Sequence, residues 1–419
     1  MTSVVPLRVQ QPLNDFQKLM RKWTTLAPYN AGHIMRVSGA PEIERWSTAL
    51  ADVLRAPGLM EEDRFPVELS TLEIDQKITE ELSTPFPEGA LPVRAFVLAD
   101  ARESHLLGVF FDHWFADSAS IRALMHRAFA HYRGVTGDLP PLQLAAARGP
   151  VFPPLAGLVS CLRAYFRHRR AHRFKLRTPL DFGTGFFSMR FPAGAIDRIR
   201  AVAKAQDATV NDLFLAATAQ VLGEFTAKRR TAKPTRFLRT RRDRIGIATA
   251  VDLRPRGGGA DNAFGFFLEY FTVVLDQPEK RTLRELTSTV ARQTTKGKAH
   301  ARASHFLWNL RGAQWVWDHL STPRSQALYS QKTMPILAGI SNVDLTGSWA
   351  DKQAAPADGC AAVLDYFRVS PVGPLAPLLF TLTTIRDRLS LSVTYRTTAF
   401  SRTESEQLAL NLRDRLSAE

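Results

Sequence analysis

Two stretches of alternating strand and helix patterns, one in each half of the chain, most constrain its fold. In the first half, extended runs at Val93–Leu98 and Leu106–Phe111 are rich in aliphatic and aromatic residues, while Ile43–Leu54 and Ile121–Tyr132 have apolar residues at helical spacing. A sheet and an amphipathic helix must each bury an apolar face against another element. We therefore expect the first half to form packed layers of strands and helices.

The second half repeats this alternation. Extended runs are expected at Phe187–Phe191, Ile245–Val251, Phe266–Leu275, Ile336–Val343, Phe380–Ile385 and Leu389–Tyr395. Helices are expected at Ile196–Ala205, Leu213–Phe225 and Glu404–Leu416, and Thr209 or Asn211 is a suitable N-cap for the second of them. The same kind of layered structure is therefore predicted twice.

The segment between the halves, residues 134–185, carries most of the turn signals in the chain. With 419 residues, of which 45% are hydrophobic, the chain can build more than one core. We therefore predict an α/β (α+β) protein of two lobes, each a mixed sheet with flanking helices. Residues 1–178 form the first predicted lobe and residues 179–419 the second.

Cysteine usage and apolar runs indicate where such a chain works. Cys161 and Cys360 are its only cysteines, so neither a disulfide framework nor a cysteine-based zinc cluster is expected. The N-terminal sequence has no basic segment followed by an apolar run, so no secretory signal is predicted. The longest apolar runs, Phe264–Leu275 and Pro371–Leu382, are too short to span a membrane. We expect a cytoplasmic, monomeric protein.

The positive charge of the chain is concentrated in two segments. Arg163–Arg177 and Lys228–Arg244 together account for its whole net charge of +15. Such segments attract anionic partners, although a solvated basic face without a partner is an equally simple interpretation. Nucleic acid is not predicted, because no zinc-finger spacing, RNA-binding aromatic motif or leucine zipper accompanies the basic runs. The candidate docking residues are Arg163, Arg167, Arg169, Arg170, Arg239, Arg241 and Arg242.

The first basic segment has a second interpretation. Apolar residues from Leu155 to Phe166 fall at helical spacing beside the arginines, which predicts a basic amphipathic helix. A helix of this kind can lie on an anionic membrane surface. Weak peripheral membrane association is therefore an alternative to docking of a protein or a phosphorylated cofactor.

His113 is the main candidate for a catalytic side chain. Neutral histidine accepts a proton at cellular pH, and His113 lies where an apolar strand ends and a helix follows. Asp117, four positions later, is expected to lock the loop by pairing with an arginine. A histidine followed by an acid at this spacing also arises by chance, so a packing histidine is the alternative. The other histidines show no metal-ligand spacing, and no metal site is predicted.

Around His113 the sequence resembles the condensation-domain and CoA-dependent acyltransferase superfamily. The signature of that superfamily is His-His-x-x-x-Asp-Gly followed by a helix, and here the matching residues are Asp112-His113-Trp114-Phe115-Ala116-Asp117-Ser118. Further similar stretches follow the order of the family across nearly the whole chain. They are Tyr29–His33, Ala208–Leu213, Val251–Arg256 followed by Asn262–Gly265, Ser341-Asn342, and Phe400–Leu416.

The resemblance implies a fold and a set of site residues. It implies two lobes of the chloramphenicol acetyltransferase type, with an active-site tunnel between them and His113 as the general base. It also implies that Asp117 pairs with Arg254, with Arg256 as the second choice. Asn342 or Ser341 would donate to the developing oxyanion, although both can equally be turn residues.

The resemblance also implies the substrates. The donor would be an acyl thioester on the phosphopantetheine of an acidic carrier protein or on coenzyme A, with no other cofactor bound. The acceptor would be a small-molecule alcohol or amine, which enters from the opposite face. The product would be an ester or an amide of natural-product or lipid assembly.

Two residues of the motif depart from the family pattern. Asp112 stands where the first histidine is usual, and an acid beside His113 can raise the pKa of the imidazole or reorient it. Ser118 stands where glycine is usual, which restricts the backbone of the turn. The alternative function is therefore a catalytically degenerate scaffold that binds a carrier protein or an acyl chain.

Overall fold

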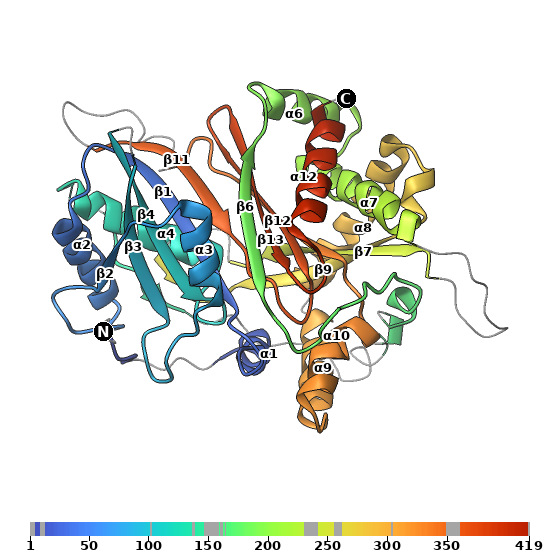
Figure 1. Ribbon diagram of the computed structural model, residues 1–419, viewed down its shortest axis with the longest axis horizontal. Coiled ribbons are helices and arrows are strands. Elements are labelled where there is room, and N and C mark those ends of the chain that lie inside the picture. The colour runs from blue at the N-terminus through green and yellow to red at the C-terminus, as the bar shows by residue number, and fades with distance from the viewer. Residues whose placement is uncertain are drawn as a thin grey trace.

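The computed structural model describes residues 5–8, 13–100, 103–135, 139–145, 159, 162–163, 165–229, 242–254, 262–302, 305–348 and 361–417. Two large sheets stand side by side in these residues, with a small two-stranded sheet in addition (Figure 1). The first has the order β11-β1-β4-β3-β2 and the second β6-β13-β12-β10-β7-β9. Both contain parallel and antiparallel pairs, which confirms the predicted mixed α/β lobes.

Each predicted extended run of both halves contains a strand, although the runs predicted at Phe187–Phe191, Phe266–Leu275 and Ile336–Val343 extend one or two residues beyond it. Those of the first sheet are β1 (Asn30–Ser38), β2 (Val67–Ser70), β3 (Val93–Asp100), β4 (Ser104–Asp112) and β11 (Val363–Val369). Those of the second are β6 (Thr184–Arg190), β7 (Arg244–Asp252), β9 (Leu268–Asp276), β10 (Ala338–Asp344), β12 (Leu378–Ile385) and β13 (Arg388–Arg396). The short strands β5 (Gln143–Leu144) and β8 (Ala263–Phe264) form the small sheet.

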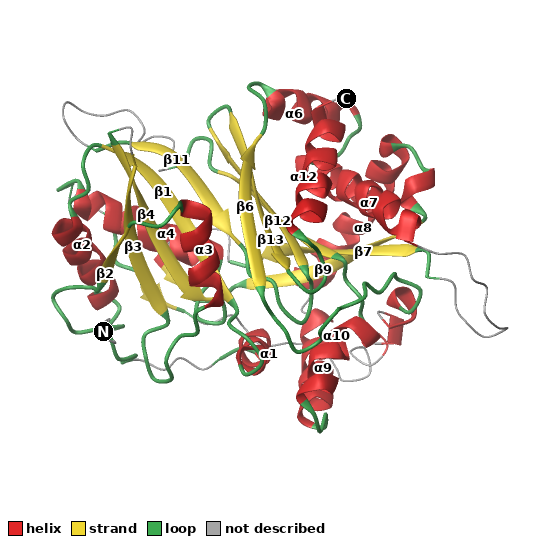
Figure 2. Cartoon of the chain, viewed as in Figure 1, coloured by secondary structure: helices red, strands yellow, loops and turns green. Residues whose placement is uncertain are grey.

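Helices flank both large sheets (Figure 2). They are α1 (Asp15–Thr24), α2 (Ile43–Arg55), α3 (Ile74–Ser83), α4 (Ser118–Tyr132), α6 (Ala195–Ala205), α7 (Val210–Arg229), α8 (Leu283–Arg302), α9 (His305–Asp318), α10 (Pro323–Thr333) and α12 (Arg402–Ser417), with the 3₁₀ helix η2 (Pro278–Lys280). Among the described residues, none of these helices combines the length and apolarity needed to cross a membrane.

The first sheet is completed by a strand from the far end of the chain. β11 pairs antiparallel with β1, so that Arg368 lies opposite His33. The predicted boundary at residue 178 stays a prediction, but this pairing means that residues of both predicted lobes build the first sheet. Side chains close to both ends of the sequence therefore meet where the two large sheets come together.

Each lobe has its own core. In the first, α2 and α4 cover one face of the sheet, where Trp46, Leu50 and Phe129 are buried. In the second, α7 lies inside the lobe, and its residues 213–217 are all apolar and fully or almost fully buried. Thr209 caps α7 as predicted, since the Asp212 backbone N–H donates to the Thr209 hydroxyl at 3.2 Å.

A third apolar cluster joins the lobes and positions the site. It packs residues of α1, including Phe16 and Trp23, against Phe266 and Tyr270 of the second lobe. The α1 helix is held by its N-terminus, because Asn14 Nδ2 donates to the Phe266 carbonyl at 3.1 Å. One turn later, the Gln17 side chain donates to the Trp114 carbonyl at 2.8 Å, which fixes the loop after β4.

Candidate active site

His113 is the first residue after β4, and its backbone remains bound to the sheet. Its N–H donates to the Tyr29 carbonyl at 3.0 Å, next to the start of β1. Successive side chains of a strand point to opposite faces. Phe111 and His113 accordingly line one cavity, whereas Asp112 and Trp114 line another. The motif therefore presents its histidine and its unusual aspartate to different spaces.

The imidazole of His113 lies among aromatic rings. Its centroid is 5.8 Å from that of Tyr29, 5.9 Å from Phe111 and 5.7 Å from Phe266. Burial lowers the pKa of His113 to about 4, against the opposing effect of the Asp117 carboxylate. Its Nδ1 is buried and has no hydrogen-bond partner of standard geometry among the described residues. The ring is therefore neutral at cellular pH.

Asp117 forms no hydrogen bond with this ring among the described residues, and instead anchors the loop. It is the N-cap of α4, and its Oδ1 accepts from the Ser120 backbone N–H at 2.9 Å and from Arg254 Nη2 at 2.6 Å. Its Oδ2 accepts from the backbone N–H of Phe267 at 2.8 Å. The carboxylate is 0% exposed. The structure thus joins Asp117 to Arg254, the pairing that the family resemblance implied, while Arg256 lies outside the described residues.

Ser120 completes this connection, although sequence reasoning did not single it out. Its hydroxyl donates to the Gly265 carbonyl at 2.8 Å and accepts from Gly265 N–H at 3.0 Å and from Arg254 at 2.7 Å. The sequence gives little indication of this role, because Ser120 is simply the third residue of a helix, and another serine, Ser118, lies in the same first turn. Ser120 and Asp117 together fasten the start of α4 to the second lobe.

The cavity that contains His113, called the histidine cavity here, lies between the two large sheets and has a volume of about 130 Å³. Most of its wall is apolar, with alanine, leucine and aromatic side chains from both lobes. Its polar and ionisable side chains are Tyr29, His33, His113, Ser118, Thr249, Glu269, Tyr270, Ser341, Arg368 and Ser370. A largely apolar cavity with a few converging polar groups is typical of a small-molecule site.

The structure separates the two candidates for the oxyanion donor. Ser341 of β10 lines the histidine cavity, whereas Asn342 is not among the residues of its wall. The Ser341 hydroxyl accepts a hydrogen bond from Arg368 Nη1 at 2.9 Å, and the same guanidinium nitrogen is 3.3 Å from the Ser118 hydroxyl. Arg368 was not predicted, because no motif marks it in the sequence.

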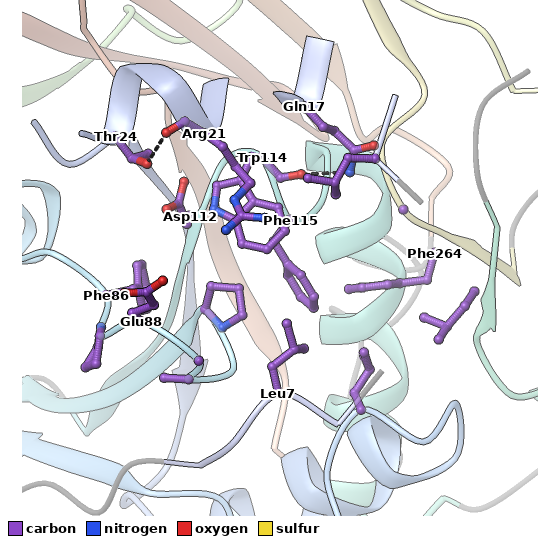
Figure 3. Close-up of a pocket in the computed structure, with 18 of the residues that line it drawn as sticks. Leu7, Gln17, Arg21, Thr24, Phe86, Glu88, Asp112, Trp114, Phe115 and Phe264 are labelled. Atoms are coloured by element: carbon purple, nitrogen blue, oxygen red, sulfur yellow. Dashed lines mark hydrogen bonds between the residues drawn. The ribbon is translucent and has the colours of Figure 1, made fainter. Parts of the chain in front are cut away.

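A larger cavity of about 620 Å³, called the N-terminal cavity here, lies on the Asp112 side of the loop (Figure 3). Trp114 and Phe115 form part of its wall, and the guanidinium of Arg21 is 5.1 Å from the centroid of the Trp114 ring. Asp112 is 7% exposed and its Oδ1 has no hydrogen-bond partner among the described residues. Burial raises the pKa of Asp112 to about 7.

A third cavity of about 280 Å³, called the tyrosine cavity here, adjoins the histidine cavity. The two share Tyr270 and Leu375 in their walls. Residues of α9 and α10 form much of the tyrosine cavity, and Tyr165, which is 50% exposed, lies at its rim. The tyrosine cavity therefore shares part of its wall with the histidine cavity and is also lined by Tyr165 of the first basic segment.

The described parts of the two basic segments lie side by side. Ala171 forms a bridge with Arg244, and Arg242 Nη1 donates to the carbonyls of Arg169 and Ala171 at 3.2 Å each. Of the predicted docking residues, Arg163, Arg167 and Arg169 are exposed. Arg170 instead pairs with the buried Asp243 at 3.0 Å. Arg239 and Arg241 lie outside the described residues, as does most of the predicted amphipathic helix.

No protein-family model and no curated protein sequence matches this chain. Solved structures do match it over nearly its whole length. The condensation domain of the monacolin K polyketide synthase MokA is 14% identical with a TM-score of 0.64, and the match covers 99% of this chain and 97% of that one. For SgcC5 from Streptomyces globisporus the identity is 14%, the TM-score 0.60 and the coverage 97% and 98%.

The epimerization domain from the third module of tyrocidine synthetase B is similar to the same extent. It is 15% identical with a TM-score of 0.61, and the match covers 100% of this chain and 97% of that one. The chain therefore has a condensation-domain-like fold, with the two lobes that the sequence resemblance implied. Domains named for different reactions share this fold, so the reaction of this chain must be argued from its site.

Proposed function

We propose that this protein is an acyltransferase that moves an acyl group from a thioester to a hydroxyl or amine acceptor, with His113 as the general base. The observation that carries the proposal is a neutral, buried imidazole in a cavity between two lobes. Burial keeps His113 unprotonated at cellular pH, and aromatic side chains hold its ring. The condensation-domain-like fold supports acyl or peptidyl transfer in general.

The reaction needs one proton transfer in each direction. The acceptor O–H or N–H gives its proton to His113 as the oxygen or nitrogen attacks the thioester carbonyl carbon. The tetrahedral intermediate then expels the thiolate, which takes the proton back from His113. An ester or amide bond forms, the carbon–sulfur bond breaks, and the free thiol leaves. A positioned base of this kind contributes roughly 10²–10⁴-fold in rate.

Ser341 is the proposed donor to the oxyanion of that intermediate. It lies in the wall of the same cavity as His113, and its hydroxyl accepts from Arg368, which leaves its own O–H for a ligand. Such a donor, fixed before the reaction begins, stabilises charge that develops only in the transition state. Asn342 is the less suitable choice because it is not part of that wall.

The donor thioester is proposed to arrive through the tyrosine cavity. That cavity adjoins the histidine cavity at Tyr270 and Leu375, and its rim includes Tyr165 of the basic segment. An acidic carrier protein fits the exposed Arg163, Arg167 and Arg169 there, and a multidomain nonribosomal peptide synthetase is among the similar structures. The acceptor would enter from the opposite face and bind in the histidine cavity, because His113 lies in the wall of that cavity.

Intact-mass measurement of acyl carrier proteins tests this function. The protein is incubated with acylated carrier proteins and a panel of alcohols and amines, and loss of the acyl mass together with gain of the ester or amide identifies both substrates. His113→Ala should lower that loss roughly 10²–10⁴-fold while the folded state, followed by circular dichroism, is retained.

The alternative, a scaffold that binds a carrier without chemistry, has a specific observation behind it. Asp112 replaces the usual first histidine and is held with a raised pKa beside His113. If the His113→Ala variant deacylates carrier proteins as fast as the original protein, with both above the uncatalysed rate, His113 is not the base. If the original protein and the His113→Ala variant bind the acylated carrier equally well and neither turns it over, the protein is a scaffold.

A further inference from the structure

Arg368 of β11 is a buried cation in the wall of the histidine cavity. It is 2% exposed, and its guanidinium donates to the Leu382 carbonyl at 2.7 Å and to the Ser341 hydroxyl at 2.9 Å. Longer contacts of 3.3 Å reach the Thr383 hydroxyl, the Ser118 hydroxyl and the Ser341 carbonyl. All of these acceptors are neutral. In the described part of the chain, Arg368 forms no ion pair.

The surroundings of Arg368 leave its charge without compensation. Burial and the nearby Arg122 lower the pKa of Arg368 to about 9, and the hydroxyl of Tyr366 opposes this only in part. The cavity wall also includes the buried side chain of Glu269, but Glu269 is not among the groups that shift the pKa of Arg368. A buried charge without a counter-ion is costly, so the site favours a ligand that brings a negative charge.

Two serine hydroxyls contact this guanidinium, and a third serine hydroxyl lies in the same cavity wall. Ser118 and Ser341 accept from Arg368, and Ser370 accepts from Thr381 Oγ1 at 2.8 Å. All three line the histidine cavity, and the hydroxyl protons of Ser118 and Ser341 have no hydrogen-bond acceptor among the described residues, whereas Ser370 can also donate to Thr381. A hydroxyl that accepts one bond keeps one donor of its own. A ligand that satisfies this end of the cavity must therefore supply acceptor oxygens.

We propose that Arg368, with Ser118 and Ser370, binds a carboxylate carried by one of the two substrates, next to the group that reacts at His113. This rests on the proposed acyl transfer and narrows its substrate class to molecules with a carboxylate close to the reacting carbonyl, hydroxyl or amine. Arginine suits this role because its planar donors match the two oxygens of a carboxylate. The 3.3 Å contact to Ser118 is the bond most readily exchanged for the ligand.

A matched pair of small fluorinated probes tests the carboxylate site directly. Binding of 4,4,4-trifluorobutanoate and of the neutral 4,4,4-trifluorobutanamide to the full chain is measured by ¹⁹F NMR. The acid should bind at least about tenfold more tightly than the amide, as hydrogen bonds to charged groups imply. Equal affinities, or no binding of either probe, would overturn the proposal without affecting His113, whose role is tested by turnover.

Two arginine variants show whether Arg368 causes the preference. Arg368→Met should reduce the ratio of the two affinities to about one. Arg396→Met is the matched control, because Arg396 is 1% exposed, donates to the carbonyls of Pro179 and Asp181, and is not in the wall of the histidine cavity. It should retain the preference for the acid. A preference that survives Arg368→Met would refute the assignment.

A milder substitution keeps the test valid if Arg368→Met does not fold. Ser370→Ala removes one hydroxyl from the cavity wall and leaves every hydrogen bond of Arg368 in place. It should weaken binding of the acid roughly threefold to tenfold and leave binding of the amide unchanged. Equal weakening of both probes would count against a carboxylate site.

Displacement of the fluorinated acid distinguishes the two sources of the carboxylate. Succinyl-pantetheine represents an anionic donor and 3-hydroxybutanoate an anionic acceptor, with butanoyl-pantetheine and 3-hydroxybutanamide as their neutral matches. Displacement by one anionic compound and not by its neutral match supports the proposal and names the substrate that carries the charge. If neither anionic compound displaces the probe better than its match, the proposal is wrong.

Discussion

Arg254 and Asp117 lie 137 positions apart and meet in an ion pair of 2.6 Å that fastens the loop of His113 to the second lobe. The Asp117 carboxylate is fully buried, and the Arg254 side chain is 10% exposed. Because this carboxylate also caps α4 and accepts from Phe267, a single side chain fixes the loop, the helix and the start of β9. The position of His113 therefore depends on a contact between the lobes.

The stability of the protein should reflect this pair. Arg254→Met leaves the buried Asp117 carboxylate without its cation and should lower the free energy of unfolding by about 3–5 kcal/mol. Asp252→Asn is the control, because Asp252 also pairs with Arg254, at 3.1 Å, but is 45% exposed, so its loss should cost less than about 1 kcal/mol. Urea unfolding measures both, and equal effects would show that burial of Asp117 is unimportant.

Asp112 should make the stability depend on pH in an unusual direction. Its folded-state pKa, raised to about 7, lies above the ordinary value of 3.8. The folded state therefore favours the protonated form, and the stabilisation is complete below about pH 4 and is lost as the pH rises toward 7. Asp112→Asn should remove this dependence, so that its advantage over the original protein grows to on the order of 4 kcal/mol by pH 8.

Denaturant unfolding at several pH values tests that expectation. The difference in free energy of unfolding between the Asn variant and the original protein is plotted from pH 4 to pH 8. A difference that stays constant across this range would mean that Asp112 titrates at its ordinary pKa. Asp112 faces the N-terminal cavity. A ligand that changes this pH dependence of the stability difference would therefore be assigned to that cavity.

Local patterns in the sequence predicted much of the site, because the motif lies in one stretch. The strand before His113, the helix after it and the pairing of Asp117 with Arg254 were expected from these patterns and from the family resemblance. The sequence could not predict whether the side chains of Asp112 and His113 line the same cavity, because this depends on where β4 ends. The structure resolves this by the alternation of side chains along the strand.

Other parts of the site depend on packing that no local pattern contains. Arg368 reaches the histidine cavity because β11 crosses to the first sheet and pairs with β1, and an isolated arginine in a short apolar strand gives no sign of this. The same holds for Tyr270, which lies in the walls of both the histidine cavity and the tyrosine cavity. The closeness of the two basic segments likewise follows from the bridge between Ala171 and Arg244.

The rate of acyl transfer should fall only at strongly acidic pH. With its pKa lowered to about 4, free His113 stays a proton acceptor well below the ordinary histidine range. The ratio kcat/KM, which reports on the free enzyme, should be constant above about pH 5 and decline with a midpoint near 4. Circular dichroism at each pH excludes unfolding. A midpoint near 6.5 would show that the imidazole is not held neutral by burial.

Ser341 and Asn342 should differ in their effects on turnover although they are adjacent. Ser341→Ala removes a hydroxyl from the wall of the histidine cavity and should lower kcat about 10²–10³-fold, as expected for loss of an oxyanion donor. Asn342→Ala should change kcat less than about threefold, because only Ser341 is in that wall. A larger loss of kcat in Asn342→Ala than in Ser341→Ala would identify Asn342 as the oxyanion donor. Substrate KM should change little in either variant.

Charge reversal tests the proposed docking surface. Arg163, Arg167 and Arg169 are exposed, and their combined substitution by glutamate should slow association with an acidic acyl carrier protein about tenfold or more at low salt. The effect should shrink as salt rises, since ions screen exposed charges. Arg170 is left unchanged, because its partner Asp243 is buried and its loss would affect folding instead.

Arg388→Glu, compared with the single substitution Arg163→Glu, provides the control for this charge reversal, because each of the two changes the net charge by two units. Arg388 is exposed on β13, where it donates to the Leu364 carbonyl at 3.1 Å, far in sequence from the basic segments. Its substitution should change the association rate less than about twofold relative to the original protein, because salt screens the interaction between the carrier protein and a single charge outside the docking surface. Stopped-flow measurements with a labelled carrier protein compare the two variants. Equal slowing in both would mean that net charge, and not the surface beside the tyrosine cavity, guides the carrier.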